Sequence, residues 1–508
     1  MVHRGKLSAA CGPCRSRRLK CDQKRPFCSQ CIRAKRECSG YRDVTAGRFY
    51  DQTEEVKQKN LSASPPDSPG NSSALTLSPH KRRCHSSESL VGQQLFFPLS
   101  EQGTAFMLSR YLGHDSLNQG RGRVASVLPN VLAPSGRAVA ASLNAVGLAA
   151  LSNIHQSSQL LHNARQEYIS ALTATNSVLS DPVESMSNST LVAVAFLGMY
   201  ELMTCDGPPL MEKYLNHIHG CERLLQLRGS SQLREPVGLG LFTQFRQTIV
   251  LGNFYLKKTT PSWLIDLSHE AIACQGGSST ENELFLLMAR VGDLCAGLKD
   301  GPPTEPVKFV QQTLKLDAEF GAWSMSVEPS RCYTTVEVPE HADKGSGYPS
   351  FQHIHGKYYH MYPDPVASSW WSDYRLARLL LLELICYFCD YLARKDEATS
   401  SNYRQAITHS TAVSRQLTED ICASVPYHLG ATAESPNEDW GSPRTGGTLR
   451  LIWPLFIATD CVGVTPQTKD WIADTLFKIG HVVGVQQAVF MSTSIRAGRV
   501  LYWMPDLE

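Results

Sequence analysis

The chain lacks a long hydrophobic run. Its opening residues, MVHRGKLSAACGPC, contain no apolar core of a secretory signal, and Glu383 interrupts the most apolar stretch, LARLLLLELICYFCDYLARK. We therefore expect neither a secretory leader nor a membrane span. A chain that stays in a reducing compartment seldom keeps disulfides, so its 16 cysteines require another explanation.

Short motifs of the common enzyme classes are also absent. No G-x-S-x-G, Walker A or G-x-G-x-x-G sequence stands in a suitable context, and there is no H-E-x-x-H. Two groups of histidines are close in sequence but have no third ligand at a recognisable spacing: His217 with His219, and His353 with His355 and His360. We interpret them as structural and expect that the protein is not an enzyme.

A repeated cysteine spacing stands near the start of the chain. CGPCRSRRLKC (11–21) and CSQCIRAKREC (28–38) share the pattern C-x2-C-x6-C, which places six cysteines in register: Cys11, Cys14, Cys21, Cys28, Cys31 and Cys38. Disulfides, an iron–sulfur centre, zinc and coincidence are the competing explanations. The reducing compartment argues against disulfides.

The number of cysteines is consistent with two zinc ions. Zinc prefers four tetrahedral ligands, and a C-x2-C pair offers two thiolates on one turn. Two zinc ions need eight ligand positions, which six thiolates fill if two sulfurs bridge both metals. By the symmetry of the repeat, Cys11 and Cys28 are the natural bridges. Because so short a segment cannot bury a core, we expect residues 8–40 to be unfolded without zinc.

Charge is distributed unevenly along the chain. The first 43 residues carry 12 Lys and Arg against 3 Asp and Glu, whereas the remaining residues carry 37 against 44. A basic head on a mildly acidic body indicates a polyanionic partner for the head.

The cysteine segment resembles the fungal Zn2Cys6 binuclear cluster family of transcription factors. Besides the six cysteines, the residues that carry the resemblance are Arg15, Leu19, Lys20, Asp22 and the pair Arg25-Pro26. The resemblance implies two zinc ions, a short helix and an extended strand in each half, and a turn shaped by Pro26. It further implies contact with double-stranded DNA around Arg18, reading of CGG-type triplets, and regulation of genes transcribed by RNA polymerase II.

Four basic residues are the candidate DNA contacts. A helix that starts at Cys14 would direct Leu19 inward against the cluster. The basic residues that it would display around its first turns are Arg15, Arg17, Arg18 and Lys20. Arginine can pair bidentately with guanine in the major groove, and its neighbours can neutralise phosphates. The second half has fewer charges in its loop and an opposing Glu37, so we assign it to zinc binding and phosphate proximity.

Beyond the cysteines the composition predicts three parts: a zinc and DNA-binding domain at 1–43, a flexible Ser/Pro-rich linker at 44–94, and an α-helical regulatory domain at 95–508. The linker has no sustained apolar heptads and several prolines, so it should not form a dimerising coiled coil. Either the protein binds as a monomer, or the regulatory domain supplies the contact of a homodimer.

Apolar residues recur at helical spacing through the third part, and strand-like pattern is scarce apart from pieces such as 333–338. We expect an all-α fold with helices near 137–180 (one or a pair), 189–204, 211–229, 238–257, 282–298, 306–322, 366–396, 401–424, 446–462 and 467–498. This part resembles the fungal-specific regulatory domain that accompanies such zinc clusters. Cys386 and Cys389 form a C-x2-C pair within an apolar helix, so we interpret them as core residues.

The resulting hypothesis is a zinc-dependent, sequence-specific DNA-binding transcription factor in the nucleus, with transcription machinery or co-regulators as further partners. The alternative is a zinc-dependent nucleic-acid or protein interaction module without sequence-specific readout.

Overall fold

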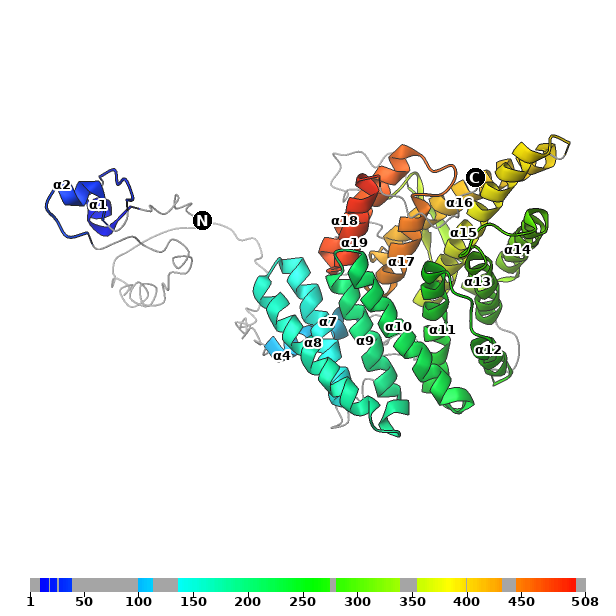
Figure 1. The fold of residues 1–508 in the computed structure, drawn as a ribbon, viewed down its shortest axis with the longest axis horizontal. Helices are drawn as coiled ribbons and strands as arrows, with labels where there is room; N and C mark the ends of the chain where they lie inside the picture. Colours follow the sequence, from blue (N-terminus) through cyan, green and yellow to red (C-terminus); the bar gives the residue numbers. More distant parts are fainter. Residues whose placement is uncertain are drawn as a thin grey trace, which may run out of the picture. The chain divides into compact units, whose positions relative to one another are not determined.

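The structure is a computed structural model that describes residues 10–17, 19–24, 27–38, 99–112, 136–274, 280–338, 354–398, 400–431 and 445–498. The chain divides into two compact units, Met1–Gly92 and Gln93–Glu508 (Figure 1). The predicted linker at 44–94 lies outside the described residues, as do the predicted domain boundaries, Arg18, Pro26 and His353. Each unit is treated by itself below.

The first unit contains two one-turn helices, α1 (Gly12–Ser16) and α2 (Ser29–Arg33), each of which begins directly after the first cysteine of a C-x2-C pair. The two short helices confirm the predicted fold of this segment. Both halves also close in the same way, because the N–H of Leu19 donates to the carbonyl of Cys14 at 2.9 Å and that of Arg36 donates to Cys31 at 3.0 Å. The repeat in sequence is therefore a repeat in backbone structure.

Two expectations about this segment are wrong. Helix α1 begins at Gly12 instead of Cys14 and ends at Ser16, because the Leu19–Cys14 bond closes it after one turn. The side chain of Leu19 is 51% exposed and does not turn inward against the cysteines. Within the described residues 10–38 neither half contains a hydrogen-bonded strand.

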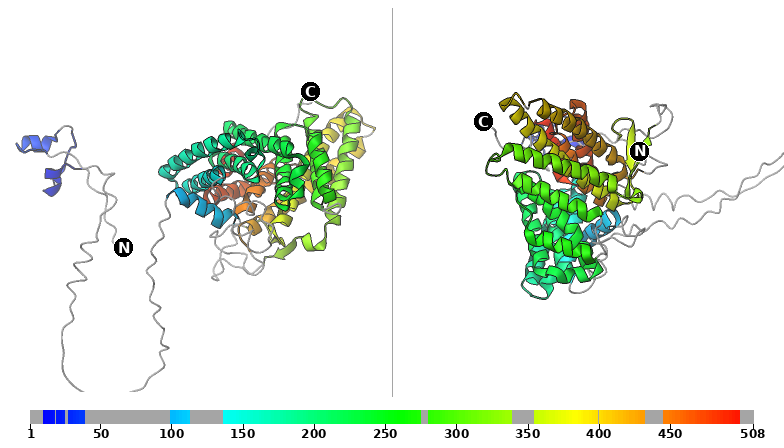
Figure 2. Two further views of the ribbon diagram at one scale, coloured as in Figure 1. Left: turned by 90° about the horizontal axis from the view of Figure 1, so that it is seen from below. Right: turned by 90° about the vertical axis from the view of Figure 1, so that its right-hand side faces the viewer.

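The second unit is built almost entirely of helices, which confirms the predicted all-α fold (Figures 1 and 2). Its first helices are α4 (Leu99–Met107), α7 (Arg137–His155), α8 (Ser158–Leu179), α9 (Asn188–Thr204), α10 (Pro208–Arg228), α11 (Pro236–Leu256), α12 (Ser262–Cys274) and α13 (Thr280–Ala296). They are followed by α14 (Pro306–Ser326), α15 (Pro365–Lys395), α16 (Ser400–His428), α17 (Thr445–Ala458), α18 (Pro466–Val483) and α19 (Gln486–Arg496). An antiparallel pair, β1 (Thr334–Glu337) and β2 (Tyr358–Met361), joins Thr334 to Met361 in register.

Most predicted helices are present within a few residues of their expected ends. The segment 137–180 forms the pair α7 and α8, with Gln156 between them in the left-handed conformation at φ 50°. The segment 467–498 was expected as one helix, but Gly484 at φ 84° divides it into α18 and α19. Helices α4 and α12 and strand β2 were not predicted from the sequence.

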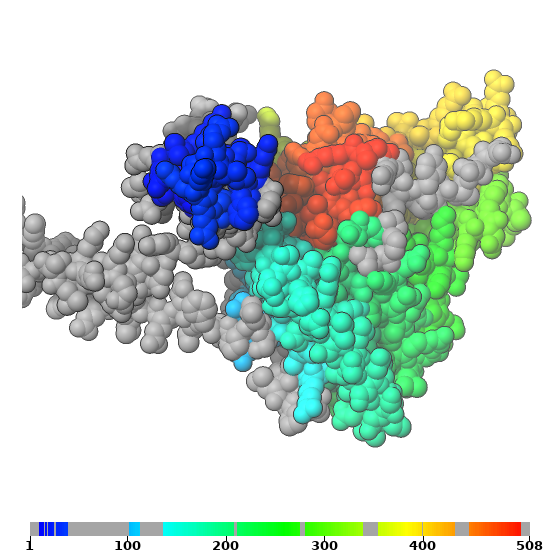
Figure 3. Space-filling model, turned by 60° about the vertical axis from the view of Figure 1, so that its left-hand side comes forward, coloured from blue at the N-terminus to red at the C-terminus, as the bar shows by residue number. Residues whose placement is uncertain are grey.

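Helices α7 and α15 lie in the hydrophobic core. α7 packs against α4, α8 and α9, and α15 packs against α14, α16 and α17. In the space-filling view of Figure 3 the C-terminal helices lie against the earlier ones, where α18 contacts α7 and α19 contacts α9. α7 is long and apolar enough to cross a membrane, but 67% of its apolar window is buried inside this unit, as expected of a core helix.

Candidate metal centre and nucleic-acid interface

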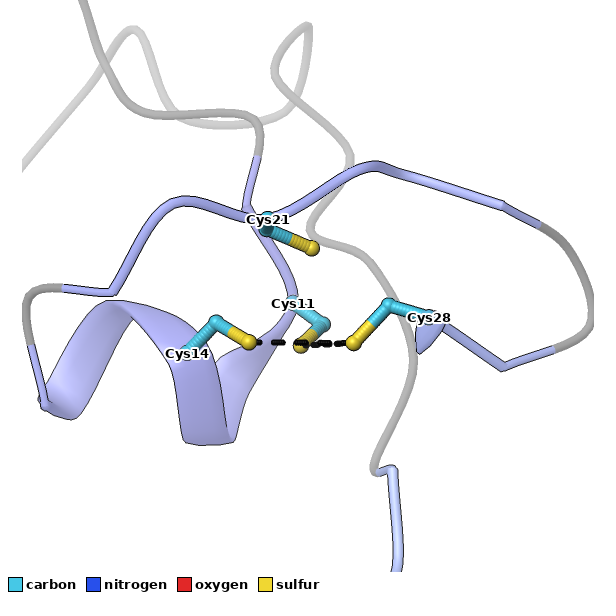
Figure 4. A group of neighbouring side chains, drawn as sticks. All are labelled: Cys11, Cys14, Cys21 and Cys28. Carbon is cyan, nitrogen blue, oxygen red and sulfur yellow. Dashed lines mark hydrogen bonds between the residues drawn. The ribbon is translucent and has the colours of Figure 1, made fainter. Parts of the chain in front are cut away.

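Helices α1 and α2 bring six cysteine sulfurs together. Two sets of four sulfurs can be drawn, and within each set every pair of atoms lies within 4.8 Å. One set contains Cys11, Cys14, Cys21 and Cys28, and the other contains Cys11, Cys28, Cys31 and Cys38. Figure 4 shows the first set, in which the sulfur of Cys11 lies between those of Cys14 and Cys28. These two residues belong to both sets.

The sulfur separations fit zinc. A tetrahedral zinc ion with Zn–S bonds of about 2.3 Å holds its sulfur ligands about 3.8 Å apart. The Sγ atoms of Cys11 and Cys28 are 3.5 Å apart, Cys11 and Cys31 are 3.7 Å apart, and Cys14 and Cys28 are 3.7 Å apart. All six cysteines except the half-buried Cys21 are buried, so water is largely excluded from the sulfurs. The type of ligand atom and the distances between the sulfurs therefore both suit two zinc ions.

The acid–base properties of the thiols couple metal binding to proton release. Desolvation raises the pKa of Cys11 and of Cys14, and hydrogen bonding with Cys28 raises the pKa of Cys31 to about 12. Backbone hydrogen bonds involving Cys11 and Gln23 lower the pKa of Cys21 to about 7. Zinc binds thiolates, and its two positive charges offset the cost of removing these protons, so metal binding and deprotonation are coupled.

Local hydrogen bonds fix the second half against the first. The sulfur of Cys28 caps α2 by accepting a hydrogen bond from the N–H of Cys31 at 3.3 Å. The carboxylate of Asp22, just after the first half, accepts a hydrogen bond from the N–H of Ser29 at 3.0 Å. Hydrogen bonding with Ser29, through its side chain first and its backbone N–H as well, lowers the pKa of Asp22. Asp22 thus joins the end of one half to the start of α2. In the sequence Asp22 was only part of the family pattern, and this role was not predicted.

Three of the four predicted DNA-contacting residues lie in α1 or shortly after it in the described part of the chain. Arg15 belongs to α1, whereas Arg17 and Lys20 are exposed on the segment that follows it. This placement corrects the expectation that these residues fan around a longer helix. In the second half Arg33, Lys35 and Arg36 are exposed as well. Exposed basic side chains therefore follow the first cysteine pair and also the second.

The other candidate ligands do not assemble into a metal site. Within the described ranges, the two cysteine sets are the only groups of three or more potential metal ligands. His217 lies 3.2 Å from the hydroxyl of Tyr168, and His355 lies 3.3 Å from that of Thr468. His360 is stacked on Tyr333, and desolvation lowers its pKa to about 3.

The Cys386–Cys389 pair is also structural. Both side chains are buried in α15, and desolvation raises the pKa of Cys386 to about 12 and that of Cys389 to about 11. These cysteines are therefore thiols at neutral pH rather than reactive thiolates.

Comparison with known families agrees with this geometry. Residues 9–47 match the fungal Zn(2)-Cys(6) binuclear cluster domain, and residues 75–489 match the fungal specific transcription factor domain. The second match extends over most of the chain. The chain belongs to the fungal specific transcription factor family. As in the Zn(2)-Cys(6) domains that it matches, its six clustered cysteines bind two zinc ions.

Individual relatives share shorter regions with this family member. The transcription factor dbaG of Emericella nidulans is 30% identical over 142 residues, which cover 27% of this chain and 32% of dbaG. White-opaque regulator 2 of Candida albicans is 49% identical over 35 residues, which cover 7% of this chain and 8% of that protein. The transcriptional regulatory protein moc3 of Schizosaccharomyces pombe is 44% identical over 41 residues, or 8% of each chain.

The matched region thus spans about a third of the length of dbaG and much less of the other two relatives. No solved structure matches the chain significantly.

Proposed function

We propose that the protein is a zinc-dependent, sequence-specific DNA-binding transcription factor that acts in the nucleus on genes transcribed by RNA polymerase II. The observation that carries the proposal is the pair of four-sulfur sets that share Cys11 and Cys28, in a segment whose basic residues Arg17 and Lys20 are exposed. Membership of the fungal specific transcription factor family supports it.

Cys11 and Cys28 bridge the two zinc ions in this proposal. Cys14 and Cys21 complete the coordination of one ion, and Cys31 and Cys38 complete that of the other. Each zinc then has four sulfur ligands, which is the closed coordination of a structural site. With no open position for water or substrate, the metals organise the backbone and carry out no reaction.

The residues that contact DNA are Arg15, Arg17, Arg18 and Lys20. The one-turn helix α1, locked by zinc at Cys14, holds this segment in one conformation. An arginine from it pairs with guanine O6 and N7 in a CGG-type triplet, and its neighbours contact phosphates. The excess of 12 basic over 3 acidic residues in the first 43 positions strengthens the attraction to the DNA backbone.

The helical unit binds the transcription machinery or co-regulators in this proposal, and it supplies the contact if the protein dimerises. Its extensive apolar core and the absence of heptads in the linker sequence favour this unit over the linker as the dimer interface. The mass of the protein in solution, with and without the first 94 residues, tests that assignment.

Selection of bound sequences from a random duplex pool tests the main proposal. The zinc-loaded full chain should enrich a defined CGG-type triplet, and binding should weaken steeply as salt rises. Enrichment of no sequence, with binding otherwise intact, would instead identify an interaction module without sequence-specific readout. Binding unaffected by a zinc chelator would contradict the role of the metal.

A further inference from the structure

The helical unit contains a polar hollow of about 510 Å³ that the proposed DNA-binding function does not use. It lies between α10, the end of α11 with the connection that follows it, and the last residue of α13, and α11 contacts both α10 and α13. Figure 1 shows these three helices as neighbours. The polar residues that line the hollow include His219, Glu222, Arg223, Asn253, Lys257 and Lys258.

The wall of the hollow has an excess of positive charge. Arg223, Lys257 and Lys258 form no ion pair with any carboxylate in the described part of the chain. The Lys258 ammonium instead lies 3.2 Å from Nε2 of His219, and Glu222 is the one acidic residue among those lining the hollow. Three cations against one carboxylate is unusual in a unit whose sequence is mildly acidic.

The two lysines are not needed to close α11. The backbone does this by itself, because the N–H groups of Lys257 and Lys258 donate to the carbonyls of Phe254 and Asn253. Lys257 adopts φ 48°, a left-handed conformation in which glycine is favoured and a lysine is strained. Strained residues cluster at ligand sites in proteins, and this lysine lies beside a cavity.

Asn253 provides a second, independent observation. Its side chain is only 4% exposed, yet no residue described in the structure makes a hydrogen bond to its amide. Its amide atoms are not completely enclosed, and Asn253 is one of the residues that line the hollow. A buried amide without a partner costs free energy unless a ligand or water satisfies it.

The geometry points to a binding site for a small organic anion that carries a phosphate or a carboxylate group. The anionic oxygens would lie among Arg223, Lys257 and Lys258, and the amide of Asn253 would donate to them or to a polar group nearby. The volume is within the range of small-molecule sites. Such a site would make the helical unit a receptor for a small anion, which goes beyond DNA binding.

Calorimetric titration of the zinc-loaded full chain tests the inference. The probes are inorganic phosphate and succinate, each added at constant ionic strength set with chloride. We expect saturable binding of at least one probe. Lys258→Gln should weaken it about tenfold, since a charged hydrogen bond is lost. Asn253→Asp, which keeps the shape but adds a negative charge, should abolish it. Lys315→Gln, at an exposed lysine on α14, is the matched control and should bind as the unaltered protein does.

The outcomes separate the sources of the anion. Binding of phosphate alone assigns a phosphorylated ligand, and binding of succinate alone assigns a carboxylate ligand. Absence of binding by both probes, or binding that Lys258→Gln and Asn253→Asp leave unchanged, overturns the inference. Because the readout is heat of anion binding and not DNA binding, failure here leaves the proposed transcription-factor function untouched.

Discussion

At the scale of single residues, the six cysteines are unequal although their spacing is symmetric. Cys11 and Cys28 each belong to both four-sulfur sets, whereas the other four cysteines belong to one set each. The two shared residues stand at equivalent places, because α1 starts directly after Cys11 and α2 starts directly after Cys28. Both C-x2-C pairs therefore direct their sulfurs toward one cluster. Removing a shared sulfur and removing an unshared one should therefore have different consequences.

Cys28→Ser should lose both zinc ions, because each set is left one thiolate short. Cys38→Ser leaves Cys11, Cys14, Cys21 and Cys28 intact, so this variant should keep about one zinc per chain. Zinc content per chain, measured by mass spectrometry, distinguishes the two. Cys274→Ser, at an exposed cysteine outside both sets, is the control and should keep both ions. Equal zinc contents for Cys28→Ser and Cys38→Ser would disprove the bridging role.

Arg17 and Lys20 should also differ in effect, although both are exposed beside α1. If Arg17 pairs with guanine, Arg17→Ala should reduce discrimination between CGG and a mutated triplet by about 1–3 kcal/mol. If Lys20 contacts phosphate, Lys20→Ala should weaken binding to all sequences alike and reduce the slope of log affinity against log salt by about one. Titrations on matched duplexes at several salt concentrations measure both. Equal losses on both duplexes for Arg17→Ala would remove it from base reading.

At the scale of secondary-structure elements, the crossing of α4 and α7 depends on two glycines. A Cβ added at Gly147 would lie 2.0 Å from the carbonyl oxygen of Gly103, and one added at Gly103 would lie 2.3 Å from that of Asn144. The Asn144 side chain also accepts a hydrogen bond from the N–H of Thr104. The backbones of α4 and α7 are therefore in direct contact, which only glycine permits.

Gly147→Ala should lower the free energy of unfolding of the helical unit by about 1–3 kcal/mol, because the backbone of α4 must move away. Gly321→Ala is the matched control: Gly321 is also within a helix, α14, and nothing lies within 4 Å of its added Cβ. That variant should gain about 0.5–1 kcal/mol from the better helix propensity of alanine. Denaturant unfolding followed by circular dichroism measures both. A neutral Gly147→Ala would show that α4 does not pack as described.

A buried carboxyl in α15 should make the stability of the helical unit depend on pH. Desolvation raises the pKa of Glu383 to about 7, although its side chain accepts a hydrogen bond from the N–H of Val462. The folded state thus holds this proton more tightly than the unfolded state. Its contribution to stability is complete below the ordinary pKa of 4.5 and is lost as pH rises through about 7.

Glu383→Gln should therefore be more stable than the unaltered protein at pH 8 but not at pH 5. Its advantage in the free energy of unfolding should be about 2 kcal/mol larger at pH 8 than at pH 5. Glutamine keeps an oxygen for Val462 and cannot ionise. Thermal unfolding at the two pH values is the measurement, and Glu328→Gln, at an exposed position, is the control. If the difference in stability between the variant and the unaltered protein is the same at both pH values, Glu383 is already ionised at pH 5.

The elements also show what the sequence could and could not predict. The metal ligands were predictable because cysteine spacing alone identifies them, and the long helices because their apolar residues recur at helical period. The end of α1 was not, because it depends on the backbone bond between Leu19 and Cys14. α4 was missed because it packs against Gly147 of a helix distant in sequence. The hollow near Asn253 was missed because it forms only where three helices, α10, α11 and α13, come together.

At the scale of the whole molecule, the two units are stabilised by different means. In the described part of the first unit the buried apolar residues are Ala10 and cysteines, whereas the second unit has an extensive apolar core of its own. A unit without an apolar core depends on its metals for folding, and one with such a core does not. The charge of the sequence differs in the same way, because the first 43 residues are basic and the remaining residues are mildly acidic.

Removal of zinc should therefore affect the two units separately. With a chelator present, affinity for the selected duplex should fall at least about 1,000-fold, toward that for random DNA, because α1 is no longer held. The helical circular dichroism signal and the thermal transition of the second unit should change little, since its core contains no metal-ligand cluster among the described residues. Added zinc should restore DNA binding. A thermal transition that shifts together with the loss of DNA binding would show instead that the zinc cluster stabilises the helical unit.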